Sequence, residues 1–234
     1  MNIEFKANRD IQKQQGYTLV ELLVSLAVSA IVISGTLAGY TVFAKQYEVL
    51  NKRIEMDRDV LKVIGLIQYD IAMAGYKNYR SSVTFNPIQS ITLTSATDLL
   101  LLFDDYDGAG TLYRSLIRYS LGPGYVSAAS SGETRFKLFR DWRQCNTPET
   151  GCDLASSTSL YSAGGQGEII LDKVKTLTIS TLHNKQVGTF VNEPQLVKFA
   201  LNVTAAKKGQ DASEFITKSY DFIARAKNVS MLPW

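Results

Sequence analysis

The sequence predicts an α+β protein in which one long N-terminal α-helix packs on an antiparallel β-sheet. No charged residue occurs between Leu22 and Ala44, and the amphipathic periodicity that follows continues to about Ala74. Beyond Val83 the helical period gives way to short β-rich runs that are bounded by turn residues. Because an amphipathic helix must bury its apolar stripe, the sheet is expected to cover the second half of the helix.

The uncharged run from Leu22 to Ala44 is 23 residues long. At about 1.5 Å of rise per residue, a helix of this length crosses a hydrocarbon core of roughly 30 Å. The cations Lys6, Arg9 and Lys13 precede the run and predict a cytoplasmic N-terminus, since acidic residues contribute little to orientation. The remainder of the chain is then expected outside the cytoplasm.

Glu21 stands at the start of this apolar segment, where a carboxylate is costly. An acidic residue at the middle of a membrane span costs roughly 2.5–3.5 kcal/mol on insertion scales, and less near an end. A carboxylate in the first helical turn also gains about 0.3–1 kcal/mol from the helix dipole. Two interpretations stay open: Glu21 serves a positively charged partner, or it is a boundary residue at the membrane interface.

The N-terminal segment has a short charged leader, then Gly16, Tyr17 and the run Thr-Leu-Val-Glu, and a long apolar helix follows. This segment resembles the prepilin signal of type IV pilins and pseudopilins. The resemblance implies that a prepilin peptidase cleaves between Gly16 and Tyr17 and that the new amino terminus at Tyr17 is methylated. It also implies that Glu21 pairs with the amino terminus of a neighbouring subunit during assembly. Tyr17 departs from the usual phenylalanine, and the peptidase is expected to tolerate this.

The chain is expected to divide into four parts. The leader peptide covers residues 1–16, a transmembrane and filament-core helix covers 17–44, an amphipathic continuation covers 45–79, and a periplasmic β-rich domain covers 80–234. Gly75 is expected to cap the helix. The apolar stripe of the amphipathic part is predicted at Val60, Leu61, Val63, Ile64, Ile67, Ile71 and Ala74. Strands are predicted at Ile88–Thr94, Leu99–Phe103, Leu112–Leu121, Thr134–Trp142, Ile169–Leu182, Leu196–Thr204 and Lys218–Ala226.

Gly35 and Gly39 form a Gly-x-x-x-Gly pair in the apolar helix. A small face lets membrane helices approach closely, so the pair predicts packing against other pilin helices. The alternative is that the glycines are merely tolerated in a membrane-spanning helix.

Cys145 and Cys152 are the only cysteines, and six residues separate them in a polar loop. An even cysteine count in an extracytoplasmic domain predicts a disulfide. By loop-closure entropy such a bond contributes about 2.5 kcal/mol, a model-dependent figure. A zinc site is not expected, because His183 is the only histidine and a structural zinc site needs four Cys or His ligands.

Asp104, Asp105 and Asp107 precede Gly108 in a predicted loop. Carboxylate oxygens in a tight loop suit calcium, but the EF-hand spacing and its closing glutamate are missing. A hairpin turn without metal is therefore the preferred interpretation, and calcium stays the alternative.

Basic and aromatic residues alternate near Trp142, a pattern that could offer cations to phosphates and rings to bases. The cations are Arg135, Lys137, Arg140 and Arg143. Because the net charge is only +3, a strand with one solvated face is the preferred interpretation, and nucleic acid is not expected as a partner.

No catalytic arrangement stands out in the sequence, and neither an enzyme nor a cofactor is expected. A Ser-His-Asp or Cys-His site would have to use His183, which is read as an exposed turn histidine. The glycines at 164–167 lack the Gly-Lys-Ser/Thr ending of a phosphate loop.

Later segments resemble the PilW-type minor pilins more loosely, among them Asp70–Tyr76 and Phe222–Asn228. This resemblance implies a structural subunit that is held in the inner membrane as a precursor, then joins the pilus at or near its tip and primes assembly with other minor pilins. Its implied partners are other minor and major pilins and a tip adhesin. The J-type pseudopilin of type II secretion stays an alternative, and a membrane-anchored periplasmic enzyme or binding domain is a more distant one.

Overall fold

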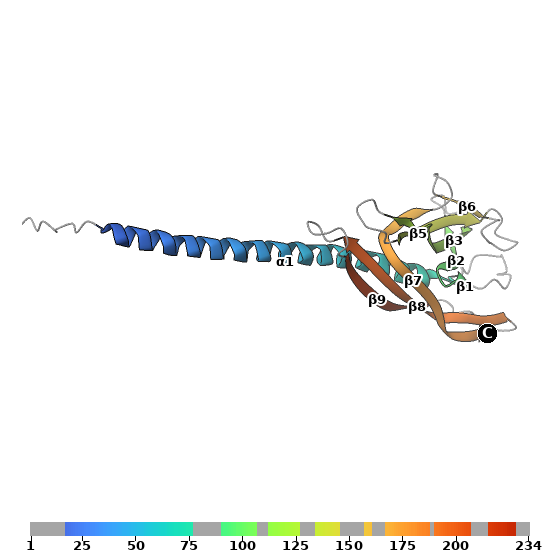
Figure 1. The fold of residues 1–234 in the computed structure, drawn as a ribbon. Helices are drawn as coiled ribbons and strands as arrows, with labels where there is room; N and C mark the ends of the chain where they lie inside the picture. The colour runs from blue at the N-terminus through green and yellow to red at the C-terminus, as the bar shows by residue number, and fades with distance from the viewer. Residues whose placement is uncertain are drawn as a thin grey trace, which may run out of the picture. The chain divides into compact units, whose positions relative to one another are not determined.

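The computed structural model describes residues 17–76, 90–106, 112–126, 134–145, 157–160, 167–187, 190–206 and 215–227. Within these ranges the helix α1 (Leu19–Met73) is followed by nine strands (Figure 1). The strands are β1 (Ile91–Ser95), β2 (Asp98–Tyr106), β3 (Leu112–Leu121), β4 (Tyr125–Val126), β5 (Thr134–Cys145), β6 (Ser157–Ser159), β7 (Glu168–Val187), β8 (Phe190–Ala206) and β9 (Phe215–Arg225). The predicted α+β fold, a long helix with an antiparallel sheet, is confirmed.

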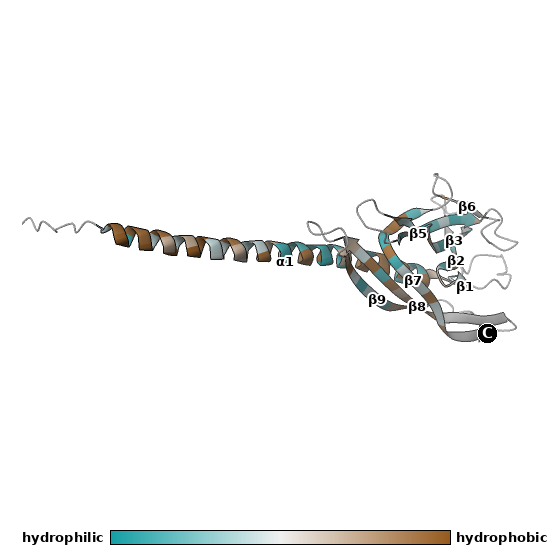
Figure 2. Ribbon diagram, in the orientation of Figure 1, coloured by the Kyte–Doolittle hydropathy of each residue, from teal (hydrophilic) through white to brown (hydrophobic). Residues whose placement is uncertain are grey.

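The chain divides into an N-terminal unit, residues 1–48, and a C-terminal unit, residues 49–234. In the N-terminal unit every described side chain from Tyr17 to Tyr47 is exposed. Figure 2 shows this part of α1 as predominantly apolar. The most apolar 18-residue window of α1 has a mean hydropathy of 2.1 and none of it is buried, so the helix is long and apolar enough to cross a membrane.

In the C-terminal unit one stripe of α1 packs on the sheet. Its buried apolar residues are Met56, Val60, Val63, Ile67 and Ile71, which recur every three or four positions as a helix of 3.6 residues per turn requires. The predicted stripe was wrong at Leu61, whose side chain is 62% exposed, and it omitted Met56.

The helix ends at Met73, one residue before the expected Ala74. Gly75 follows with a φ of 74°, the left-handed conformation that suits glycine at a helix C-terminus. Its amide donates to the carbonyl of Leu102 at 2.8 Å, and the amide of Asp104 donates to the carbonyl of Tyr76 at 2.9 Å. The end of α1 is therefore tied to β2.

The described strands form one antiparallel sheet in the order β1-β2-β3-β5-β7-β8-β9, and β4 and β6 also pair with β5. The sheet curls, so that the turn after β1 meets β7, where the amide of Ile179 donates to the carbonyl of Ala96 at 2.7 Å (Figure 1). The inner face of this curl and the buried stripe of α1 make the main core.

Several strand predictions need correction. β3 has the predicted bounds, but β2 runs on to Tyr106, so Asp104 and Asp105 lie in a strand and not in a loop. β7 runs on to Val187, which places the backbone of His183 in a strand and not in a turn. The two shortest strands, β4 and β6, were not predicted.

Candidate functional site

The N-terminus of α1 is closed by a reciprocal pair of side chains. The amide and the hydroxyl of Thr18 donate to Glu21 Oε2 at 2.9 and 3.0 Å, and the amide of Glu21 donates to Thr18 Oγ1 at 3.3 Å. This is a capping box, in which two side chains satisfy amides that have no partner within the helix. The Thr-x-x-Glu spacing was present in the sequence, but Glu21 was interpreted only through its charge.

Glu21 therefore has a local structural role besides any role in assembly. Both bonds from Thr18 end on Oε2, so Oε1 stays able to accept a further hydrogen bond. The side chain of Tyr17 is exposed at the same end of the helix. Gly16 lies outside the described residues, so the cleavage site itself is a prediction.

The apolar part of α1 satisfies its own polar side chains. Ser25, Ser29 and Ser34 donate to backbone carbonyls three or four residues earlier in the helix, at 2.7–2.9 Å. Thr36 and Thr41 do the same at 2.8 Å. Because these hydroxyls need no outside partner, the surface suits lipid or another apolar helix.

Gly35 and Gly39 lie one turn apart on this exposed helix. A Cβ built at either glycine meets no heavy atom within 4 Å, so neither is required by packing inside this chain. The glycine pair remains a predicted contact for another helix.

A buried polar cluster joins the end of α1 to the sheet. Arg140 on β5 donates from Nε to Asp70 Oδ2 at 2.7 Å and from Nη2 to Asp70 Oδ1 at 3.1 Å. Tyr119, the cross-strand neighbour of Arg140 on β3, also donates its hydroxyl to Asp70. Asp70, Arg140 and Tyr119 are only 2%, 8% and 0% exposed. Burial and the adjacent Asp70 carboxylate raise the pKa of Tyr119 well above its usual value.

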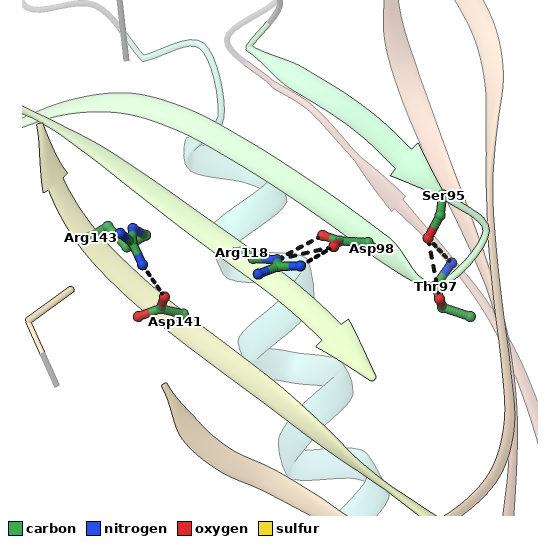
Figure 3. Close-up of polar contacts among 6 residues, drawn as sticks. All are labelled: Ser95, Thr97, Asp98, Arg118, Asp141 and Arg143. Atoms are coloured by element: carbon green, nitrogen blue, oxygen red, sulfur yellow. Dashed lines mark hydrogen bonds and ion pairs between the residues drawn. The ribbon is translucent and has the colours of Figure 1, made fainter. Parts of the chain in front are cut away.

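The cations of β5 do not form a solvated face, so that prediction was wrong. Arg135 and Arg140 are buried, and Arg143 donates to Asp141 at 2.9 Å (Figure 3). Lys137 lies over the ring of Tyr125, at 5.4 Å from its centroid. These contacts direct the described cations of the strand towards neighbouring side chains of the same chain.

The aspartate cluster is likewise different from the prediction. Asp104 lies on β2 and forms a buried ion pair with Arg114, whose Nε is 3.4 Å from Asp104 Oδ1. No group of three or more His, Cys, Asp or Glu residues that could hold a metal occurs among the described residues. Asp107 and the side chain of Asp105 lie outside them, so calcium stays an untested alternative.

Cys145 at the end of β5 is buried and disulfide-bonded. Cys152, the other cysteine of the sequence, lies outside the described residues.

The prokaryotic N-terminal methylation motif matches residues 11–37 of the chain. This segment contains Gly16, Tyr17, Glu21 and Gly35. No curated protein and no solved structure matches the chain. The motif indicates interaction with a prepilin peptidase and with other pilins, and together with the apolar helix it supports a type IV pilin-like or pseudopilin protein.

Proposed function

We propose that this protein is a PilW-like minor pilin, a structural and non-enzymatic subunit of a type IV pilus. The methylation motif at residues 11–37 carries the pilin-like part of the proposal, and the likeness of later segments to PilW-type minor pilins narrows it. The exposed apolar surface of α1 supports it, because such a surface needs lipid or other helices around it. The subunit is held in the inner membrane by a single span before assembly and joins the pilus at or near its tip.

In this proposal the peptidase hydrolyses the bond between Gly16 and Tyr17 and leaves a positively charged amino group on Tyr17. That group is then methylated. In the assembling filament Glu21 accepts a hydrogen bond from the amino terminus of a neighbouring subunit. The free Oε1 supports this role, since the carboxylate can receive the new donor without giving up its bonds from Thr18.

The remaining predicted sites belong to the same proposal. Gly35 and Gly39 form the closest contact with the helices of other minor and major pilins. Cys145, at the end of β5, forms a disulfide with Cys152. The bond persists because the domain lies in the periplasm and, after assembly, on the cell surface. A tip adhesin is the further partner.

The test is to express the full precursor together with a prepilin peptidase and to determine the mass and amino-terminal sequence of the product. The expected product begins at methylated Tyr17, whereas Gly16→Ala leaves the precursor uncut. Glu21→Ala is expected to be cut but not incorporated into pili. Glu55→Ala is the matched control, because Glu55 is an exposed acid on the same helix that pairs with Lys52 at 3.1 Å. A mature protein that keeps residues 1–16 would contradict the proposal.

The J-type pseudopilin is a second candidate, because the methylation motif supports pilin-like proteins and pseudopilins equally. Complementation separates the two: a minor pilin restores piliation to a strain that lacks the gene, and a pseudopilin restores secretion of folded proteins instead.

A further inference from the structure

Two tyrosines and a phenylalanine form an exposed aromatic stripe near the C-terminal end of the uncharged segment of α1. Tyr40, Phe43 and Tyr47 are 69%, 67% and 56% exposed, and their spacing of three and four residues places them on one face of the helix. The rings of Phe43 and Tyr47 stack, with 6.5 Å between their centroids and 16° between their planes. Because all three rings are largely exposed, this aromatic stripe is available to a partner outside the chain.

The hydroxyls of the two tyrosines distinguish the aromatic stripe from the apolar surface before it. Every serine and threonine hydroxyl from Ser25 to Thr41 donates to a carbonyl of the same helix. The hydroxyls of Tyr40 and Tyr47 make no hydrogen bond within the part of the chain that the structure describes. A tyrosine has an apolar ring and a polar end, so the stripe suits surroundings that are apolar on one side and rich in hydrogen-bond acceptors on the other.

A cation lies at the same level of the helix as the aromatic stripe. Lys45 is the first charged residue after Glu21, it is exposed, and its ammonium forms no ion pair with the described residues. Lys45 is two residues from Phe43 and from Tyr47, so its side chain leaves from nearly the opposite face of the helix. Hydrogen-bond donors therefore surround α1 at this level. A layer of lipid headgroups meets all of them, whereas a second helix would contact only one side.

The length of helix between Glu21 and Tyr40 matches the thickness of a bilayer. Tyr40 follows Glu21 by nineteen positions of the continuous helix, which correspond to roughly 28 Å at about 1.5 Å of rise per residue. The hydrocarbon core of a bilayer is roughly 30 Å thick. An embedded segment that ran on to Ala44 would be roughly 34 Å long and would place the Tyr40 hydroxyl in hydrocarbon, where a polar group without a partner is strongly disfavoured.

We propose that the end of the apolar segment is a headgroup anchor, which binds phospholipid headgroups on the non-cytoplasmic side of the membrane. The headgroup anchor consists of Tyr40, Phe43, Lys45 and Tyr47. Its hydroxyls and its ammonium donate to phosphate and ester oxygens, and its rings lie at the boundary between headgroups and acyl chains. The segment within hydrocarbon is then residues 22–39, and Glu21 lies at the opposite headgroup layer. This inference rests on the single membrane span of the proposed function, and not on the place of the subunit in a pilus.

The experiment reconstitutes the full chain at low protein density in vesicles of phosphatidylethanolamine and phosphatidylglycerol. A spin label on Ala38→Cys or Ala44→Cys reports depth through its collisions with oxygen, which concentrates in hydrocarbon, and with a water-soluble nickel chelate. The unsubstituted chain gives the background of the native cysteines. The Ala38 label is expected to collide preferentially with oxygen and the Ala44 label with nickel, with ratios that differ at least threefold.

Removal of the headgroup anchor should let the helix sink into the membrane. Tyr40→Leu, Lys45→Leu and Tyr47→Leu together should draw the Ala44 label into hydrocarbon and lower its nickel collisions at least threefold. The three side chains lie outside the buried core, so the triple variant is expected to fold. Tyr69→Leu is the matched control, because Tyr69 is a 63% exposed tyrosine on the same helix beyond the anchor, and it should leave the Ala44 label unchanged.

An Ala44 label that already lies in hydrocarbon without the other substitutions, or that does not move in the triple variant, would overturn the headgroup anchor and leave the membrane span in place. A boundary that shifts with protein density would assign the aromatic stripe to a second copy of the chain and would overturn the anchor too. A Leu26→Cys label that collides freely with nickel would show that α1 does not cross the membrane, which contradicts the span of the proposed function as well.

Discussion

Arg140→Met removes the cation from the buried cluster at the end of α1 and leaves the carboxylate of Asp70 with the hydroxyl of Tyr119 as its described side-chain partner. Asp70 is 2% exposed, so the substitution leaves a buried carboxylate without its cation. Breaking a buried ion pair by removing one partner costs about 3–5 kcal/mol. The expected loss of unfolding free energy is of that size, or roughly 6–20 °C in the unfolding temperature of a chain of this length.

The double variant Asp70→Leu with Arg140→Met tests the reason for this loss. When both charges are replaced by apolar side chains of similar size, no uncompensated charge remains, so the double variant should be more stable than either single variant. Arg118→Met is the control within the same protein. Arg118 also bonds a carboxylate, that of Asp98, through Nε and Nη2. The two side chains are 34% and 14% exposed, so the expected cost is below about 1 kcal/mol.

The assay is chemical unfolding of the full chain in detergent, followed by tryptophan fluorescence and circular dichroism. Additive losses in the double variant would refute the reasoning, because they would show that the two residues act independently. An equal loss in Arg118→Met would refute it too, since burial would then not decide the cost.

Ile67→Ala is expected to lower the unfolding free energy by about 2–5 kcal/mol and Leu61→Ala by less than about 0.5 kcal/mol, because Ile67 is 2% and Leu61 62% exposed; a reversed order would contradict the helix register. Burial and the bond to Asp172 raise the pKa of Tyr125 to about 12, so between about pH 10 and 12 the unfolded chain loses a proton that the folded chain keeps. Stability should fall across that window and less so in Tyr125→Phe, which unfolding measured from pH 9 to 12 will check. Reduction is expected to cost about 2.5 kcal/mol and to expose two thiols at Cys145 and Cys152, whereas thiol labelling before reduction would exclude their disulfide.

The sequence was sufficient to predict the helix, the antiparallel sheet and the bounds of β3, a β-rich run that ends before Gly122. The sequence did not predict side-chain burial correctly where the partner of the side chain lies far away in the chain. From the sequence, Arg140 was predicted to be a surface cation on its strand. The fold instead brings it to Asp70, which lies seventy residues earlier in the chain. Asp104 was likewise predicted in a turn. Its carboxylate is buried in β2, because Arg114 on the next strand pairs with it.

The N-terminal site shows the opposite case. The contacts between Thr18 and Glu21 are local, and the spacing alone was enough to predict them. The glycine pair at Gly35 and Gly39 is also visible in the sequence, but the predicted contact needs a second helix, and α1 is the only helix in the part of the chain that the structure describes.

The hydroxyl groups along the apolar helix have a consequence for the assembly proposed above. Because Ser25, Ser29 and Ser34 bond to the turn before them, withdrawing the segment from a bilayer into a bundle of like segments breaks none of these bonds. In such a transfer the hydroxyls of these serines need no new partner, and the apolar side chains around them exchange contacts with lipid for similar contacts with other helices.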